Sequence, residues 1–166
     1  MSVDAATVLA AAKAKGIMIV TAESCTGGLI AGALTEVAGS SAVVDRGFVT
    51  YSNEAKASML GVAPDLIATN GAVSEQVATA MVHGALTNSK AGLAVAVTGI
   101  AGPGGGSAEK PVGLVYVAAG RSFYDVAVRE CRFDKEGVSD RSGIRQRTVD
   151  VALEMLLDQL TAAPSP

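Results

Sequence analysis

The apolar positions in the first part of the chain change their period twice. Residues 3–15 are rich in alanine and place apolar side chains at helical spacing up to Gly16, a typical C-terminal stop, so they predict a helix. Residues 17–21 form a continuous apolar run, which is typical of a strand buried on both faces. Helical spacing resumes over residues 29–34, so residues 22–28 predict a tight turn between a strand and a helix.

The middle of the chain repeats this alternation. Its apolar, aromatic and β-branched positions predict a strand over residues 46–51, a helix over 54–60, a helix over 74–88 and a strand over 93–98. Either Ser52 or Asn53 can cap the first of these helices, and Gly61 can end it.

The last third of the chain begins with a glycine-rich loop over residues 99–111. After it, the pattern predicts two strands and a closing amphipathic helix, over residues 112–118, 123–132 and 143–160. The pair Gly120-Arg121 lies between the two strands and is a hairpin signal. Residues 164–166 are predicted to be a frayed tail.

Strands that alternate with helices, followed by one late hairpin, are typical of a mixed sheet with helices on both faces. The length of 166 residues suits one compact domain, and neither a repeat nor a linker in the sequence indicates a second. We therefore predict an α/β fold in which residues 1–163 form a single three-layer α/β/α domain around a mixed central sheet.

The composition excludes several classes of protein. Hydrophobic residues make up 49% of the chain and charged residues 17%, which is the reverse of a disordered composition. One histidine, His83, and two cysteines, Cys25 and Cys131, are too few for a zinc finger or a three-histidine catalytic site, so we expect neither a metal nor a cofactor. Nucleic-acid binding depends on clustered Lys and Arg side chains that neutralise phosphates, whereas this chain has a net charge of -3, so we expect no nucleic-acid partner.

The sequence also indicates where the protein works. No apolar run approaches the roughly 18 to 20 uncharged residues of a membrane helix, and the N-terminus lacks the basic region of a signal peptide. We therefore expect a cytoplasmic protein without membrane contact, whose two cysteines stay reduced. The strand edge near Phe123 is free to pair with a second copy, and we expect a homodimer.

Ser24 is the first candidate for chemistry, because it lies in the predicted turn between the first strand and the second helix. Ligands of open α/β sheets bind at this position, where the helix start points its free N–H groups. The Gly-x-Ser-x-Gly pattern of a nucleophile elbow is absent, but the amides that follow Ser24 can hold an oxyanion: those of Cys25, Thr26, Gly27 and Gly28. Alternatively, Ser24 or Thr26 only caps the helix, and the glycines permit close packing.

A serine nucleophile needs a base, and Lys56 is the better candidate. It lies at the start of a helix that follows a strand, and burial beside Ser24 would lower its pKa and leave a neutral amine. The alternative is a solvated lysine on a short helix. His83 falls in the middle of a predicted helix, where a lone histidine is usually a surface or core residue. Tyr51 is either a core ring or a hydroxyl that orients a proton.

Residues 98–107 form a second candidate site after a predicted strand. Glycines let successive N–H groups converge on an anion, and the candidate contacts for a phosphate or a ribose are Thr98, Gly99, Gly102 and Gly105. The loop is neither a Walker A nor a Rossmann motif, because a strand follows it instead of a helix. A long flexible connection is the alternative. Arg141 and Arg145, at the start of the last helix, either clamp a phosphate or form surface ion pairs.

Five blocks of this sequence resemble the signature blocks of the CinA C-terminal domain family. They read TAESCTGG, GFVTYSNEAK, GAVS, TGIAGP and KPVG, over residues 21–28, 47–56, 71–74, 98–103 and 110–113. The resemblance runs from about the first helix to the last, with the blocks in the family's order. It implies a CinA C-terminal-like α/β domain and a metal-independent serine amidohydrolase, which converts nicotinamide mononucleotide (NMN) and water to nicotinate mononucleotide and ammonia.

The resemblance also implies a Ser/Lys dyad that works through an acyl-enzyme. Ser24 would be the nucleophile, Lys56 the base that later protonates the departing ammonia, and Tyr51 a supporting residue. The ribose phosphate would lie against the glycine-rich loop and Arg141 or Arg145. A different class of function stays open: a non-catalytic nucleotide-sensing module linked to competence or DNA damage, in which the loop binds a phosphate and Ser24 is only a cap.

Overall fold

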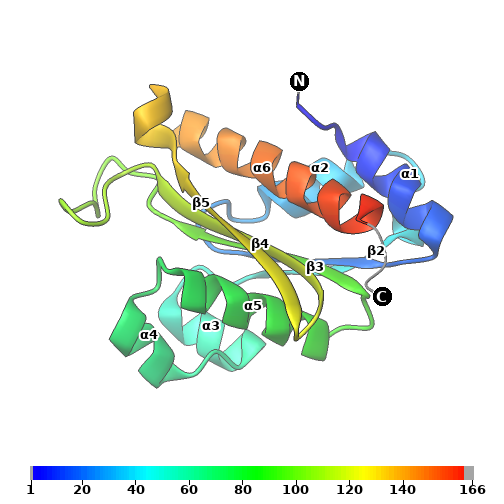
Figure 1. The fold of residues 1–166 in the computed structure, drawn as a ribbon, viewed down its shortest axis with the longest axis horizontal. Helices are drawn as coiled ribbons and strands as arrows, with labels where there is room; N and C mark the ends of the chain where they lie inside the picture. The colour runs from blue at the N-terminus through cyan, green and yellow to red at the C-terminus, as the bar shows by residue number, and fades with distance from the viewer. Residues whose placement is uncertain (1, 163–166) are drawn as a thin grey trace.

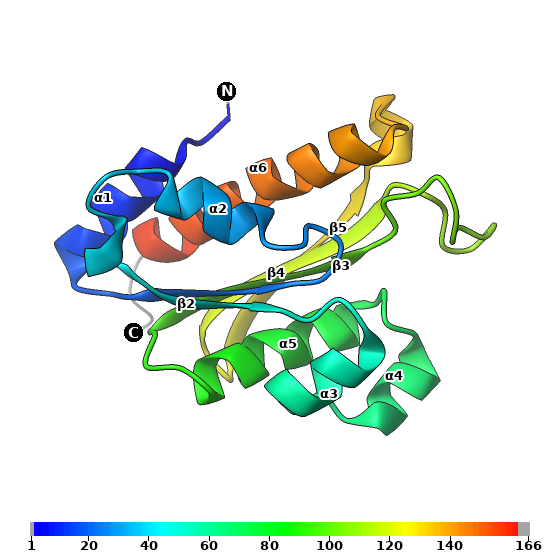
Figure 2. The same ribbon diagram turned by 180° about the vertical axis from the view of Figure 1, so that it is seen from behind.

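The computed structural model describes residues 2–162 and shows a five-stranded sheet between two layers of helices (Figures 1 and 2). The strands are β1 (Ile19–Glu23), β2 (Val44–Val49), β3 (Leu93–Gly99), β4 (Leu114–Ser122) and β5 (Asp125–Arg132). The helices are α1 (Ala5–Lys15), α2 (Leu29–Thr35), α3 (Asn53–Leu60), α4 (Pro64–Asn70), α5 (Glu75–Thr87) and α6 (Arg141–Thr161). Two short 3-10 helices cover Ser40–Ala42 and Phe133–Glu136. The predicted three-layer α/β fold with a mixed sheet is confirmed.

The sheet combines a parallel half and an antiparallel half. Its strand order is β2-β1-β3-β4-β5, in which β1 lies parallel to both β2 and β3, while β3, β4 and β5 pair antiparallel. The carboxyl ends of β1, β2 and β3 therefore meet at one edge of the sheet, where open α/β sheets bind their ligands. This edge receives the turns that follow Glu23, Val49 and Gly99.

Each face of the sheet carries its own apolar core. Helices α1, α2 and α6 cover one face and α3, α4 and α5 the other, as the two ribbon views show (Figures 1 and 2). Strand β1 sends Ile19 into the first core and Val20 and Ala22 into the second, and all five of its residues are buried. A strand covered on both faces has no solvent-exposed side, which explains why the apolar run of residues 17–20 shows no alternation as it enters the strand.

Side chains cap the helices that begin near the sheet edge. Ser52 accepts a hydrogen bond from the amide of Ala55, so Ser52 rather than Asn53 is the N-cap of α3. Ser74 caps α5 in the same way, and Asp140 caps α6. The N-terminal parts of α3 and α6 both reach the turn that follows β1, through Lys56 and Arg145.

The predicted boundaries of several elements are wrong. Strands β1 and β2 begin and end about two residues away from the predicted runs, and the sequence pattern missed α4. The predicted turn at Gly120-Arg121 lies inside β4, which continues to Ser122. Gly120 pairs with Val126, and a Cβ there would lie 2.7 Å from the Asp125 carbonyl oxygen. The glycine therefore serves a close approach between strands rather than a turn.

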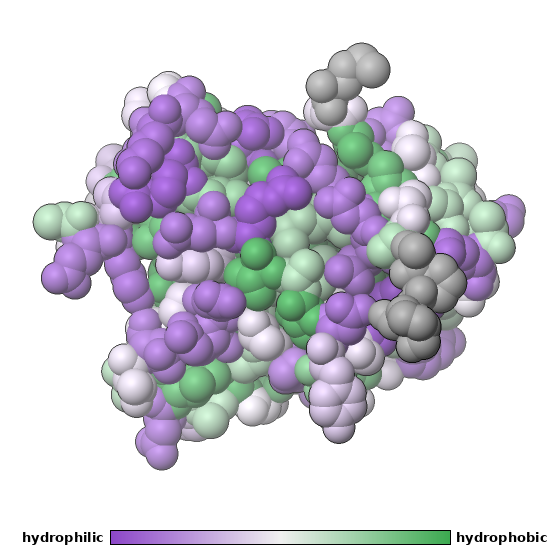
Figure 3. Space-filling model, viewed as in Figure 1, coloured by the Kyte–Doolittle hydropathy of each residue, from purple (hydrophilic) through white to green (hydrophobic). Residues whose placement is uncertain are grey.

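The hairpin between β4 and β5 ends in two exposed aromatic residues. Phe123 is 52% exposed and Tyr124 is fully exposed. The face that contains β5 is largely hydrophilic, with a small hydrophobic group near its centre (Figure 3). Pairing of this edge with a second copy stays a prediction. Within residues 2–162, no helix is both long enough and apolar enough to cross a membrane. The predicted tail at residues 164–166 lies outside the described residues.

Candidate active site

Ser24 lies directly after β1, in a turn that the sheet itself holds. Its amide donates to the carbonyl of Val97 on β3 at 3.1 Å, which extends the strand pairing by one residue. Gly27 and Gly28 then take φ angles of 59° and 106°, in the region that favours glycine, and turn the chain into α2. Ser24 is 8% exposed. The side chain is therefore fixed at the carboxyl edge of the sheet, and Gly28 rather than Ser24 or Thr26 is the N-cap of α2.

Lys56 approaches Ser24 from α3, on the opposite face of the sheet. Its Nζ atom lies 3.0 Å from Ser24 Oγ, 3.1 Å from the Thr50 carbonyl oxygen and 3.2 Å from the Tyr51 carbonyl oxygen. The residue is 1% exposed, among the largest fully buried side chains in the protein. The reading of Lys56 as a solvated surface lysine is therefore wrong.

Burial lowers the pKa of Lys56 from its usual 10.5, and a negative charge on the neighbouring Cys25 would act in the opposite direction. Cys25 supplies little such charge, because burial raises the pKa of its thiol to about 11. A neutral amine carries two N–H groups and one lone pair. The carbonyls of Thr50 and Tyr51 can accept both N–H groups, which leaves the lone pair facing the Ser24 hydroxyl. The geometry thus suits a base that removes the hydroxyl proton.

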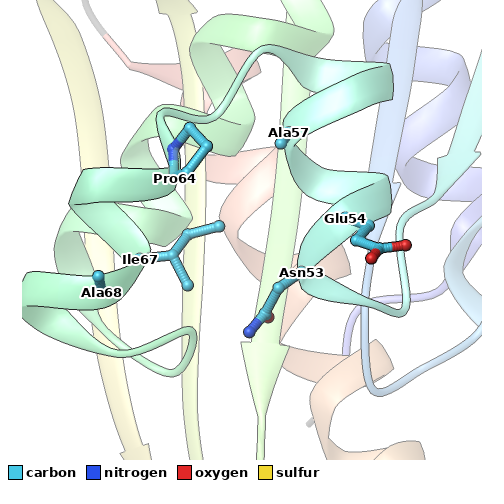
Figure 4. A pocket seen from close by; sticks show the side chains of 6 residues that line it. All are labelled: Asn53, Glu54, Ala57, Pro64, Ile67 and Ala68. Carbon is cyan, nitrogen blue, oxygen red and sulfur yellow. The ribbon is translucent and has the colours of Figure 1, made fainter.

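A polar cavity of about 200 Å³ opens onto this pair. Its walls come from five segments of the chain: Ser24 and Cys25, Tyr51 to Lys56, Ala72 and Val73, Thr98 to Ala101, and Arg141. An apolar cavity of about 370 Å³ lies alongside, between α3 and α4 (Figure 4). Asn53 lines both cavities, and its side chain extends into the gap that faces Ile67. The sequence pattern missed Asn53, Ala72 and Val73, although two of the signature blocks contain them.

Glu23 occupies the start of α2, where we expected a free anion site. Its buried carboxylate accepts hydrogen bonds from the amide of Ile30 at 2.8 Å, from the amide of Ala31 at 3.0 Å and from the Thr26 hydroxyl at 2.6 Å. The first-turn N–H groups of α2 are therefore satisfied by the protein, and the carboxylate stabilises the positive end of the helix. The expectation that α2 offers free N–H groups to a ligand is wrong.

We expect Glu23→Gln to lower the free energy of unfolding by about 2 to 3 kcal/mol, since hydrogen bonds to a charged acceptor are worth roughly that much. A glutamine side chain has one acceptor oxygen for three donors and puts a donor NH₂ group against the helix start. Urea denaturation at pH 7 measures the effect. Glu36→Gln, at the exposed end of α2, is the control and should change stability by less than about 0.5 kcal/mol. An equal effect in both variants would contradict this role for Glu23.

Arg141 joins Tyr51 to the glycine-rich loop across the mouth of the cavity. Its guanidinium donates to the Gly102 carbonyl and, at 3.0 Å, to the Tyr51 hydroxyl. Tyr51 is 59% exposed, and its hydroxyl accepts a hydrogen bond from Arg141. Tyr51 contacts Lys56 through its backbone carbonyl. Among the described residues, Arg141 forms no ion pair with a carboxylate, unlike Arg129 and Arg147.

The remaining predicted site residues lie at different depths. Thr98 is buried and donates its hydroxyl to the Ala72 carbonyl at 2.9 Å, so it holds one cavity wall to another. Gly99 lines the cavity, whereas Gly102, which is buried, and Gly105, which is exposed, do not. Arg145 donates from Nε to the Cys25 carbonyl and from Nη2 to the Thr26 carbonyl, both at 3.1 Å.

Two residues of types that often carry chemistry, His83 and Cys131, lie elsewhere. His83 lines a different cavity from Ser24, and its ring packs edge-on against Phe123 at 5.0 Å. Cys131 is buried on β5 and, like Cys25, is a free thiol. Within residues 2–162, no three His, Cys, Asp or Glu side chains gather closely enough to hold a metal ion.

A model of the CinA C-terminal domain matches residues 3–160, nearly the whole chain, and the matched region contains every element of the site. The chain belongs to the CinA C-terminal domain family. A curated relative within this family is the nicotinamide-nucleotide amidohydrolase PncC of Escherichia coli strain K12, which is 49% identical over 150 residues, or 90% of this chain and 88% of that protein. A CinA-like protein of Mycobacterium sp. strain JLS is 51% identical over 146 residues, but the match covers 34% of its length.

Solved structures agree with this membership in the CinA C-terminal domain family. The competence/damage inducible protein CihA of Agrobacterium tumefaciens is 56% identical to this chain and superposes with a TM-score of 0.90, over 98% of this chain and all of that one. A competence damage-inducible protein A of Klebsiella pneumoniae is 36% identical, with a TM-score of 0.89 over 96% of each chain. The fold is therefore that of this family.

Proposed function

We propose that this protein hydrolyses the carboxamide of NMN to give nicotinate mononucleotide and ammonia, with Ser24 and Lys56 as a catalytic dyad. The observation that carries the proposal is the contact of 3.0 Å between Lys56 Nζ and Ser24 Oγ at the base of a polar cavity. The nicotinamide-nucleotide amidohydrolases that resemble this chain support the substrate class.

Acylation begins when the Lys56 lone pair takes the Ser24 hydroxyl proton. Ser24 Oγ forms a bond to the carboxamide carbon, and the electron pair of the C=O bond moves to its oxygen. The resulting Lys56 ammonium donates its three N–H groups to the Thr50 carbonyl, the Tyr51 carbonyl and Ser24 Oγ. When the tetrahedral intermediate collapses, the C–N bond breaks and the ammonium gives its proton to the leaving nitrogen, which departs as ammonia.

Deacylation reverses these roles with water in place of the amide nitrogen. Lys56, neutral again, removes a proton from a water molecule, whose oxygen attacks the ester carbon of the acyl-enzyme. The second tetrahedral intermediate expels Ser24 Oγ, which takes back the proton from Lys56. The carboxylic acid that forms loses its remaining proton to water, so nicotinate leaves as a carboxylate. No charged side chain other than Lys56 has to change its protonation state in either half of the cycle.

Backbone amides after Ser24 supply the oxyanion hole in this proposal. The Gly27 amide donates to the Ser24 carbonyl at 3.0 Å and is therefore engaged, while Gly28 is the N-cap of α2. The amides of Cys25 and Thr26 donate to no backbone carbonyl among the turn and loop bonds of residues 2–162. They directly follow the nucleophile, which is where acyl-transfer enzymes place an oxyanion donor.

Arg141 is the residue that we assign to the substrate phosphate, together with the backbone of the loop from Gly99 to Gly105. It lines the cavity mouth, lacks a carboxylate partner among the described residues and keeps N–H donors beyond the two that it uses. We expect Arg141→Gln to raise the KM for NMN by about 10- to 100-fold, the equivalent of one charge-assisted contact.

Nicotinamide riboside lacks the phosphate, so it distinguishes loss of a phosphate contact in Arg141→Gln from a general loss of substrate binding. Its KM should not change in Arg141→Gln, because the missing contact has no counterpart in this substrate. Steady-state ammonia release with both substrates measures the two values. A parallel rise of both KM values would remove Arg141 from the phosphate site.

The function itself is tested by incubation of the purified protein with NMN in the presence of EDTA. We expect nicotinate mononucleotide and ammonia in equal amounts, detected by chromatography and by an ammonia assay. Formation of nicotinamide, from cleavage of the glycosidic bond, would overturn the amidase proposal. Thermal stabilisation by NMN without any product would instead favour the nucleotide-sensing module.

A further inference from the structure

Arg145 contacts the turn that follows Ser24, residues 24–28, rather than the cavity. It lies on α6, half-buried, and its Nε and Nη2 donate to the consecutive carbonyls of Cys25 and Thr26. It is not among the residues that line the cavity, in contrast to Arg141 one helical turn earlier. Over residues 2–162, Arg145 forms no ion pair with a carboxylate. The guanidinium therefore interacts mainly with backbone carbonyls of the turn, 120 and 119 residues away in the chain.

Both of these carbonyls are conjugated to amides of the same turn. The Cys25 carbonyl shares its peptide group with the Thr26 N–H. The Thr26 carbonyl shares its peptide group with the Gly27 N–H, which donates to the Ser24 carbonyl, and that carbonyl shares its peptide group with the Cys25 N–H. A positive donor at each carbonyl polarises these peptide groups, and hydrogen bonds in series strengthen one another by about 10–30% per bond. The hydrogen bond to the Cys25 carbonyl therefore polarises the Thr26 N–H directly. The hydrogen bond to the Thr26 carbonyl polarises the Cys25 N–H through the Gly27 amide and the Ser24 carbonyl.

We propose that Arg145 is a positioning residue for catalysis, which orients the turn after Ser24 and polarises the amides of Cys25 and Thr26 toward an oxyanion. The inference rests on the proposed amidase function and assigns Arg141 and Arg145 of α6 to different tasks: Arg141 to the substrate phosphate and Arg145 to the transition state. Gly27 permits the turn, because its φ of 59° lies in the region that favours glycine.

The substitution Arg145→Lys tests this division. A lysine keeps the charge but lacks the planar fork that reaches two carbonyls at once. We expect kcat for NMN to fall by about 10- to 100-fold, less than the 10²- to 10³-fold that follows loss of an entire oxyanion donor. The KM for NMN should stay within about 3-fold of the wild-type value, because the interaction strengthens only in the transition state. Nicotinamide riboside should lose kcat by the same factor.

An aldehyde analogue of NMN provides a readout that a merely structural role would not move. Lys56 takes the Ser24 hydroxyl proton, Ser24 Oγ adds to the carbonyl carbon of the aldehyde, and the electron pair of the C=O π bond moves to the aldehyde oxygen. The negatively charged oxygen of the resulting hemiacetal lies where the oxyanion forms. We expect the affinity of Arg145→Lys for this analogue to fall by the same factor as kcat/KM. Its affinity for nicotinate mononucleotide, which forms no adduct, should not change. Equal losses for the analogue and for the product would overturn the proposal.

Arg129→Lys is the matched control, since Arg129 is a half-exposed residue of β5 that pairs with Glu154 and contacts no part of the turn. Its activity should stay within about 2-fold of wild type. All assays are run well below the melting temperature of each variant, measured by circular dichroism. A rise of KM for NMN alone, with kcat unchanged, would assign Arg145 to the phosphate and overturn the proposal. If the wild-type protein released no ammonia from NMN, the proposed function would fail before Arg145 is tested.

Discussion

Ser24→Ala is expected to lower kcat for ammonia release from NMN by about 10⁴-fold or more, as the loss of a catalytic nucleophile does in other hydrolases. Alanine removes the only atom that forms the covalent bond, and Cys25 cannot replace it, because burial holds the pKa of its thiol near 11. The fold should survive, since the amide that pairs Ser24 with Val97 belongs to the backbone. Progress curves over hours, with NMN above its KM, measure the residual rate.

Hydroxylamine distinguishes loss of the nucleophile from loss of binding. With wild-type protein and NMN it should trap the acyl-enzyme as the hydroxamate, at the expense of nicotinate mononucleotide. Ser24→Ala should form no hydroxamate but should still be stabilised thermally by NMN. Ser58→Ala, an exposed serine on the same helix as Lys56, is the control and should match wild type in both assays. Hydroxamate formation by Ser24→Ala would assign the nucleophile to another residue.

Much of this site can be predicted from the sequence, because local sequence signals define the elements that carry it. The buried run before Ser24 requires a central strand, and the Ser52 cap with the Gly61 stop defines the short helix of Lys56. Once parallel strands bring their carboxyl ends to one edge, the turns after β1 and β2 must lie side by side. The proximity of Ser24 and Lys56 was therefore accessible as a hypothesis from the pattern alone.

Other features depend on contacts across the fold and leave no local signal. Nothing near Gly120 in the sequence says that its lack of a side chain serves the neighbouring strand, so a hairpin turn was predicted there instead. The carboxylate of Glu23 accepts the first N–H groups of α2 only because the turn after β1 brings the start of that helix back to Glu23. Likewise, Arg141 and Arg145 look alike in sequence, and only the packing of α6 sends one to the cavity and the other to the turn.

Lys56→Met is expected to lower kcat/KM by about 10³- to 10⁴-fold, at the upper end of what general acid–base catalysis contributes. Methionine fills a similar volume but has no lone pair for the Ser24 proton and no proton for the leaving nitrogen. Lys56→Arg should be equally inactive, because a guanidinium stays protonated at all accessible pH values. Lys13→Met, on the exposed face of α1, is the control and should keep wild-type activity. Substantial activity in Lys56→Arg would show that a permanent positive charge suffices and that Lys56 is not the base.

The pH dependence of the wild-type protein follows from the same residue. Because burial lowers the pKa of Lys56, kcat/KM should rise with pH through that lowered pKa and level off once the amine is neutral, below pH 10.5. The folded state then binds fewer protons at Lys56 than the unfolded state does. Between the lowered pKa and 10.5, this difference makes the free energy of unfolding increase with pH. Urea midpoints of Lys56→Met across that pH window should lack this increase, while those of Lys13→Met should retain it. A base that is neutral in the folded protein therefore affects the pH dependence of stability as well as that of the rate.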